Sequence, residues 1–149
     1  MDAVINLDKP PGITSFAAVA RVRRLTATRK VGHTGTLDPM ATGVLPLCLG
    51  RATRFSRYLV DTDKTYRATI TLGASTTSYD AEGEVVTRGD AAGVTREAVA
   101  AALAAFRGNI LQTPPMHSAL KHQGQPLYRL ARQGITIHRE PRPASVERL

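Results

Sequence analysis

A loop rich in glycine and threonine, residues 30–43, holds the residue best suited to catalysis in this chain. Its backbone amides and hydroxyl groups can face a polar ligand, and one carboxylate, Asp38, lies in its middle. Pro39 follows directly and restricts Asp38 to extended backbone conformations, which fixes where its side chain points. An Asp-Pro pair is also a common start of a turn, and taken alone that simpler interpretation would be preferred.

Other kinds of chemistry lack their sequence signatures. The chain has neither the glycine-lysine motif of a phosphate-binding loop nor the glycine pattern of a dinucleotide site. Its four histidines and one cysteine are not spaced as zinc ligands, and no catalytic triad can be argued. Asp61 and Asp63 can in principle hold a divalent cation, but a strand cap or a solvent-facing pair explains them better. An enzyme with this sequence is expected to use no metal and no cofactor, only a carboxylate.

The net charge of +8 is unevenly distributed. Residues 1–60 carry a net +6, residues 61–100 a net −3 and residues 101–149 a net +5. Basic segments on both sides of an acidic one favour a polyanionic partner, most simply a nucleic acid. A basic surface that only keeps the protein in solution explains the charge equally well.

The length of the chain fits a single domain over residues 1–149, with no linker or repeat. The longest apolar run is too short to cross a bilayer, and the N-terminus lacks the pattern of a secretory signal. Cys48 stands alone among apolar neighbours, which predicts a buried, inert thiol. We therefore expect a cytoplasmic protein with no membrane association.

Hydrophobic periodicity predicts regular elements along both halves of the chain. The predicted strands cover residues 4–7, 44–49, 66–72, 84–87 and 116–121, and the predicted helices cover residues 15–25, 52–60, 95–107 and 127–132. Residues 28–43 show no clear period and predict a loop. The expected apolar faces are Phe16, Val19 and Ala20 on the first helix and Val99, Ala102, Leu103 and Phe106 on the third. This order favours an α+β fold with a mixed, largely antiparallel sheet flanked by helices.

Four ordered blocks of sequence carry a specific resemblance. Residues 30–38, continued by 41–46 and 50–53, resemble the signature of the TruB family of tRNA pseudouridine synthases. Residues 8–15 look like the opening motif of that family, and residues 64–66, 72–73 and 80–83 look like its second. Residues 112–121, followed by 127–132, look like its third. The chain is identified on these blocks as a member of the TruB family.

The resemblance implies an activity and a role for Asp38. Members of the family convert uridine-55 in the T loop of tRNA to pseudouridine: they break the N-glycosidic bond, turn the uracil and rejoin it through carbon. The uracil must leave the base stack to be reached. The catalytic carboxylate, which attacks the nucleoside or stabilises positive charge on the sugar, is implied to be Asp38.

Further site residues follow from the resemblance. Tyr66 matches the tyrosine that stacks on the flipped base, although its alternation with polar neighbours alone favours a core position. His33 matches a histidine that contacts the RNA. Lys9, Lys64, Arg21, Arg24 and Lys30 are expected phosphate contacts, each weakly indicated. Thr36 is counted with the RNA-binding residues, although with Gly32 and Gly35 it is expected mainly to shape the loop.

The sequence also departs from the family pattern. Thr77 and Ser78 stand where the family has Asp and Thr, and His117 stands where it has Tyr. The family continues beyond the position of Leu149 with further strands, an arginine that pairs with the catalytic carboxylate, and an RNA-binding domain, so the chain is expected to be a truncated catalytic portion that is inactive alone.

Three functions remain open at this point. The first is a tRNA-modifying enzyme that acts as a monomer, and the second is a non-catalytic module that binds or folds tRNA with the same surface. The third, a cation-dependent phosphodiesterase that uses Asp61 and Asp63, is the weakest because no other carboxylates cluster with them.

Overall fold

Alternating half-buried and exposed residues form the first strand, β1 (Ala3–Lys9). It pairs antiparallel with β3 (Gly43–Leu49), and β3 pairs antiparallel on its other edge with β2 (Val31–His33). The strand order is therefore β1-β3-β2, with Leu45 opposite Leu7 and Leu47 opposite Ile5. The predicted strands 4–7 and 44–49 are confirmed, whereas β2 lies inside the predicted loop because it borrows its hydrogen bonds from β3.

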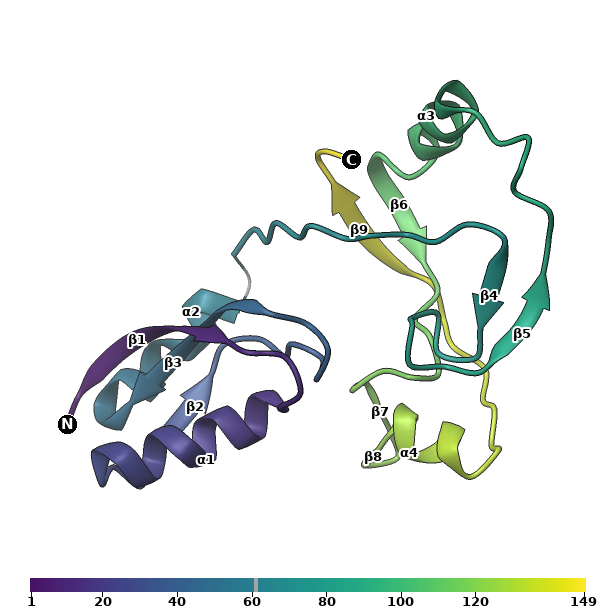
Figure 1. Cartoon of the computed structure of the whole chain (residues 1–149). Helices are drawn as coiled ribbons and strands as arrows, with labels where there is room; N and C mark the ends of the chain where they lie inside the picture. The colour runs from purple at the N-terminus through teal and green to yellow at the C-terminus, as the bar shows by residue number, and fades with distance from the viewer. Residues whose placement is uncertain (61) are drawn as a thin grey trace. The chain divides into compact units, whose positions relative to one another are not determined.

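The computed structural model describes residues 1–60 and 62–149 (Figure 1). The chain divides into two compact units, Met1–Arg67 and Ala68–Leu149, which are treated separately below. Asp61 lies outside the described residues, and with it the hypothesis of a cation site at Asp61 and Asp63. The expectation of one catalytic domain over residues 1–149 stays a prediction.

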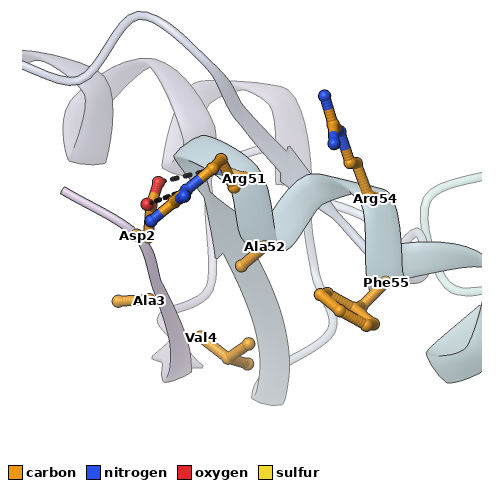
Figure 2. Close-up of a pocket in the computed structure, with 7 residues that line it drawn as sticks. All are labelled: Asp2, Ala3, Val4, Arg51, Ala52, Arg54 and Phe55. Atoms are coloured by element: carbon orange, nitrogen blue, oxygen red, sulfur yellow. Dashed lines mark hydrogen bonds and ion pairs between the residues drawn. The ribbon is translucent and has the colours of Figure 1, made fainter.

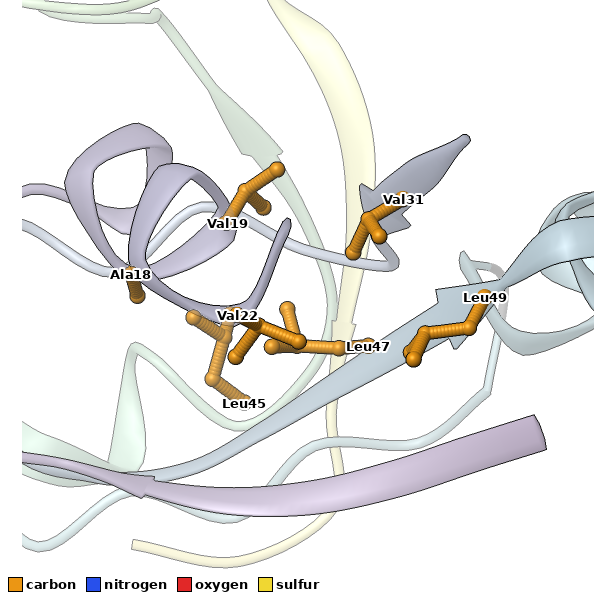
Figure 3. Close-up of a cluster of buried hydrophobic side chains, with 7 residues drawn as sticks. All are labelled: Ala18, Val19, Val22, Val31, Leu45, Leu47 and Leu49. Carbon is orange, nitrogen blue, oxygen red and sulfur yellow. The ribbon is translucent and has the colours of Figure 1, made fainter. Parts of the chain in front are cut away.

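Helix α1 (Ser15–Thr26) covers one face of the β1-β3-β2 sheet. Thr14 caps it by accepting a hydrogen bond from the Ala17 amide at 3.0 Å. Seven apolar side chains from the helix and the sheet form the core (Figure 3): Ala18, Val19, Val22, Val31, Leu45, Leu47 and Leu49. The predicted apolar face was wrong at Phe16, which is 70% exposed, and at Ala20. The buried positions 15, 18, 19 and 22 have helical spacing, but their face includes the polar Ser15.

Two short helical segments complete the first unit. Gly50 ends β3 with φ +58°, and the 3₁₀ segment η1 (Gly50–Phe55) continues into α2 (Ser56–Val60), which confirms the predicted helix 52–60. Cys48 has no exposed surface, as expected, and burial raises the pKa of its thiol.

The second unit is built from hairpins and short helices. Three antiparallel pairs form: β4 with β5, β6 with β9, and β7 with β8. The elements are β4 (Ala74–Thr76), β5 (Val85–Arg88), α3 (Arg96–Ala104), β6 (Gly108–Gln112), β7 (Lys121–His122), β8 (Gln125–Pro126), α4 (Leu127–Arg132) and β9 (Arg142–Val146). The predicted strand over residues 84–87 and the predicted helix over residues 127–132 are confirmed.

Two predicted strands do not form. Residues 66–72 pair with no other strand in the described chain, and Tyr66 and Ile70 are 68% and 73% exposed. Alternation indicates which side chains would be covered, but it supplies no hydrogen-bonding partner. Residues 116–120 also form no strand, because the carbonyls of Ser118 and Leu120 accept hydrogen bonds from the first amides of α4.

The predicted helix over residues 95–107 begins where expected, but its predicted apolar face is not buried. Thr95 caps α3 by accepting a hydrogen bond from the Ala98 amide at 3.2 Å, but the helix ends at Ala104. No residue of α3 is buried, and Phe106 is 57% exposed. The mixture of helices and antiparallel strands confirms the α+β class. Among the described residues, no helix has the length and apolar character needed to cross a membrane.

Candidate functional site

The loop that carries Asp38 is held on both sides of that residue. On one side, the buried Ser15 hydroxyl accepts a hydrogen bond from the Leu37 amide at 2.9 Å and donates one to the Leu37 carbonyl at 3.0 Å. The first residue of α1 is thus joined by two bonds to the residue before Asp38. This explains why the buried face of α1 includes a polar residue.

On the other side, the Pro39 carbonyl accepts two hydrogen bonds. The Gly12 amide donates one at 2.8 Å and the Lys9 ammonium donates the other at 3.2 Å. The residues that flank Asp38 in sequence are therefore both fixed by the segment that links β1 to α1. A carboxylate between two fixed residues is presented in a defined direction.

Lys9 has a different environment from the one expected. It has no exposed surface, and its ammonium also donates to the carbonyls of Pro10 at 2.9 Å and Ile13 at 2.8 Å. A buried ammonium needs such partners, and these three acceptors satisfy all of its donors. The expectation that Lys9 contacts a phosphate is wrong for this conformation, because its charge does not reach the surface.

The Asp38 side chain itself is exposed. Its backbone carbonyl accepts a hydrogen bond from the Ala41 amide at 3.0 Å, so Asp38 does begin a turn. Within the described residues, its carboxylate has no hydrogen-bond or ion-pair partner. The turn interpretation and the catalytic interpretation are thus compatible: the backbone makes the turn and leaves the carboxylate free.

His33 and Thr36 precede Asp38 in the same loop segment. His33 is the last residue of β2, is half-buried, and has a buried Nδ1 without a hydrogen-bond partner among the described residues. Thr36 is exposed, two residues before Asp38. Between them, Thr34 is buried and its amide binds the Pro46 carbonyl at 3.2 Å, which fastens this arm of the loop to β3.

Tyr66 and Lys64 lie after α2, at the end of the first unit. The alternative that Tyr66 is a core residue is wrong, since its side chain is largely exposed and free to meet a ligand. The Lys64 ammonium donates to the carbonyls of Val60 at 2.6 Å and Thr62 at 2.9 Å, but the residue remains exposed. Arg21, Arg24 and Lys30 are also exposed.

A basic and aromatic surface on η1 and α2 was missed from the sequence. Three exposed arginines recur at every third position, 51, 54 and 57. Arg51 and Arg54 lie on the 3₁₀ segment, where this period aligns side chains, and Arg57 follows in α2. Phe55 and Tyr58 form a second exposed row with ring centroids 6.5 Å apart, and the Arg57 guanidinium lies 4.7 Å from the centre of the Tyr58 ring. The recurrence of arginine at every third residue is the sequence signal from which this surface could have been predicted.

Part of this surface borders a hollow of about 500 Å³ between η1 and the start of β1 (Figure 2). Asp2 lies on one side, where the Arg51 backbone amide and guanidinium bind its two carboxylate oxygens at 2.7 Å and 2.6 Å. These bonds, the backbone one first, lower the pKa of Asp2. The rest is lined by Ala3, Val4, Ala52, Arg54 and Phe55, and among the described residues Arg54 has no ion pair.

Comparisons with known sequences match this chain from end to end. A model of the TruB family pseudouridylate synthase (N terminal domain) matches residues 23–149. The tRNA pseudouridine synthase B of Stutzerimonas stutzeri (strain A1501) is 58% identical over 149 residues, 100% of this chain and 48% of that protein. The protein of the same name from Dehalococcoides mccartyi (strain CBDB1) is 54% identical over 146 residues, 98% of this chain and 49% of that protein. The chain thus spans about half the length of these curated relatives.

Solved structures give the same picture at lower identity. One chain of a Cbf5-Nop10-Gar1 complex matches with a TM-score of 0.53 and 32% identity, over 80% of this chain and 31% of that chain. One chain of the archaeal box H/ACA sRNP Nop10-Cbf5 complex matches with a TM-score of 0.50 and 34% identity, over 81% and 34%. Both likenesses agree with the α+β fold.

Proposed function

Because this chain belongs to the TruB family of pseudouridylate synthases, we propose that it carries the catalytic centre of an RNA pseudouridine synthase, with Asp38 as the catalytic carboxylate. The reaction is an isomerisation: the N-glycosidic bond of a uridine breaks, the uracil turns, and a carbon–carbon bond to the sugar forms. The hydrogen on C5 of the uracil leaves as a proton and N1 gains one, so the nucleoside keeps its composition and no co-reactant is required. Asp38 acts by attacking the nucleoside or by stabilising the positive charge that develops on the sugar.

The observation that carries this proposal is the combination of a fixed loop and a free carboxylate. Ser15, Gly12 and Lys9 hold the residues on both sides of Asp38, while the Asp38 side chain is exposed and unpaired among the described residues. A residue that served only as a turn would not need four hydrogen bonds on its immediate neighbours. Positioning of this kind lowers the entropy cost of reaching the reactive geometry.

We propose tRNA as the substrate and uridine-55 of its T loop as the target. The relatives that cover this chain are named as synthases acting on tRNA. The target base must leave its stack, which costs a few kcal/mol. The exposed ring of Tyr66 offers a stacking surface worth about 1–3 kcal/mol for a flipped base. His33 and Thr36 lie close enough in sequence to Asp38 to contact the displaced nucleotides, and Lys64 is a candidate for a neighbouring phosphate.

The arginine row on η1 and α2 supplies a route for the RNA backbone. Arg51, Arg54 and Arg57 are exposed, and although Arg51 is paired with Asp2, the guanidinium groups of Arg54 and Arg57 can attract phosphates and release counterions. Binding of tRNA should therefore weaken steeply as salt rises, and Arg54→Gln should reduce the steepness by about one unit of the log–log slope. An affinity that does not change with salt would contradict this route.

We propose that the protein works in the cytoplasm, as a monomer.

The decisive experiment is a chimera in which this chain replaces the corresponding half of the Stutzerimonas stutzeri relative. The relative supplies the remaining length of a synthase. The chimera should release tritium from tRNA labelled at C5 of uridine, and Asp38→Asn should abolish release while tRNA affinity changes little. Asp63→Asn serves as a matched control, since it removes an exposed carboxylate outside the loop. Turnover by the Asp38→Asn chimera would refute the assignment, and a folded chimera that binds tRNA without turnover would favour the non-catalytic module.

Tyr66 is tested in the same chimera. Tyr66→Phe keeps the ring and should keep most of the activity if stacking is its role, whereas Tyr66→Leu should lose most of it. Since Tyr66 is exposed, neither variant should change the fold, which circular dichroism can check. Equal activity of the two variants would show that the ring does not stack on the base.

A further inference from the structure

The second unit contains a cavity of about 260 Å³ that the proposed reaction does not use. Four separate segments line it: the turn after β4, the segment after β6, the end of α4, and the segment that leads into β9. The lining residues are Thr77, Tyr79, Met116, His117, Ala131, Gly134, Thr136 and Arg139. Hydroxyl groups, an imidazole and a guanidinium thus meet in one concave place.

The guanidinium of Arg139 is the most unusual member of this lining. Its Nε is buried and has no hydrogen-bond partner among the described residues. Its one hydrogen bond in that part of the chain runs from Nη1 to the Ile137 carbonyl at 3.4 Å, which is long for such a bond. Arg139 as a whole is half-buried, and a guanidinium whose buried N–H lacks an acceptor gains a hydrogen bond from an anion.

Among the described residues, no carboxylate lines the cavity, and the acidic residues nearest to Arg139 and Tyr79 in sequence are engaged elsewhere. Asp80 accepts hydrogen bonds from the Ser78 hydroxyl and from the Glu82 amide at 2.9 Å within its own turn. Glu140, which follows Arg139, pairs with His138 at 2.8 Å. The positive charge of Arg139 is therefore not neutralised by its sequence neighbours.

Thr77 and His117 lie 40 positions apart in the chain, yet both face this cavity. Together with Thr136 and Tyr79, these side chains provide four hydrogen-bond donors beside Arg139.

We propose that this cavity binds a phosphate group through Arg139, with the hydroxyl groups of Thr77 and Thr136 and the imidazole of His117 completing its coordination. Guanidinium groups pair with phosphate through parallel hydrogen bonds, and the neutral donors around Arg139 suit the several oxygens of a tetrahedral anion. The phosphate comes either from the backbone of an RNA or from a free phosphate in solution, and both sources present the same chemistry.

The first test follows the arginine Nε–H signals of the ¹⁵N-labelled chain by NMR while inorganic phosphate is added. One signal should shift and saturate, and this response should be absent in Arg139→Gln. Arg129→Gln, which removes an exposed arginine of α4 outside the lining, should leave the response unchanged. The absence of any saturable shift, or an equal response in Arg139→Gln, would overturn the proposal.

A second pair of variants separates charge from folding. Thr77→Asp places a carboxylate beside Arg139 and should weaken phosphate binding about tenfold or more, because the guanidinium gains an internal partner. Thr77→Asn has nearly the same shape without the charge and should bind within about threefold of the unmodified chain. Phosphate affinities that are equal in the two variants would contradict a role for the charge of this cavity.

A third measurement identifies the source of the phosphate. If an RNA backbone fills the cavity, a short RNA should displace inorganic phosphate, and Arg139→Gln should lower the salt dependence of RNA binding by about one unit of the log–log slope. If free phosphate fills it, RNA should bind without displacing phosphate. These results concern the second unit alone, so they stand or fall independently of Asp38.

Discussion

The two units of this chain use similar local signals and reach different degrees of burial. In the first unit, α1 and a three-stranded sheet share one core. Among the described residues, nine apolar side chains are buried, and eight of them belong to the first unit: the seven core residues and Cys48. In the second unit, three strand pairs each stand separately, and Leu127 is the single member of that buried group. The difference lies in the partners available to each element and not in the elements themselves.

The two capped helices show this most directly. Both α1 and α3 begin at a threonine whose hydroxyl accepts a bond from the third amide that follows. Helix α1 buries four residues against β2 and β3, whereas α3 buries none. Local sequence therefore suffices to start a helix, but burial, worth about 25 cal/mol per Å² of apolar area, depends on distant segments.

The largest expected difference between the units comes from truncating a leucine. Leu47 is completely buried at the centre of the core, so Leu47→Ala should lower the free energy of unfolding of the first unit by about 3–5 kcal/mol. Leu111→Ala, at a residue of β6 that is 74% exposed, should change it by less than about 0.5 kcal/mol. Urea denaturation followed by hydrogen exchange at each amide measures both. Equal losses would show that the units do not differ in the way described.

A pair of glycines with left-handed backbones gives the next largest effect. Gly50→Ala, at φ +58°, should cost roughly 2–3 kcal/mol, because its new methyl group would clash with the Asp2 carboxylate and lie 2.5 Å from the Met1 carbonyl. Gly108→Ala, at φ +78°, meets no atom within 4 Å and should cost only the backbone strain, about 1 kcal/mol. Thermal unfolding of both variants compares a crowded unit with an open one.

The elements that the sequence predicts correctly are those with a local physical cause. The helix that starts after Thr14 follows from its cap, the helix over residues 127–132 follows from its spacing, and the strand 44–49 follows from an apolar run closed by Gly50. Strand β2 was missed because its pairing comes from β3, and β9 was missed because its partner β6 lies about 30 residues earlier. Pairings of this kind depend on the folded chain as a whole.

The candidate site shows the same division. Asp38 stands out from the sequence because it is the one carboxylate of its loop and precedes a proline. The bonds that fix this loop connect Ser15 to Leu37 and Lys9 to Pro39, across 22 and 30 residues, and no local pattern predicts them. For the same reason, Lys9 looked like a surface cation, although three carbonyls hold it inside.

The two helix caps allow a smaller test with identical chemistry. Thr14→Ala and Thr95→Ala each remove one hydroxyl and should each weaken the local helix by about 1 kcal/mol. Since α1 is part of a shared core, the Thr14 variant should lower the stability of the whole first unit. The Thr95 variant should speed amide exchange in α3 alone, because α3 has no buried contact to transmit the loss. Faster exchange limited to α1 in the first case would argue against a cooperative first unit.

The smallest expected effect concerns the ion pair of Asp2 and Arg51, which joins residues 49 positions apart. Because its pKa is lowered in the folded protein, first by the Arg51 amide and then by the guanidinium, Asp2 stabilises the fold above its unfolded pKa. That contribution is lost as the pH falls below about 4 and through the lower folded pKa.

NMR titration of the Asp2 carboxyl carbon should show a midpoint below that of a peptide with the first six residues. Arg51→Gln should raise the midpoint only partway, because the backbone bond remains. Asp2→Asn should quicken amide exchange at the start of β1, whereas Glu140→Gln, which breaks a pair between residues two positions apart, should alter exchange only at its own site. A full return of the Asp2 midpoint in Arg51→Gln would show that the guanidinium, and not the backbone, holds this end of the first unit closed.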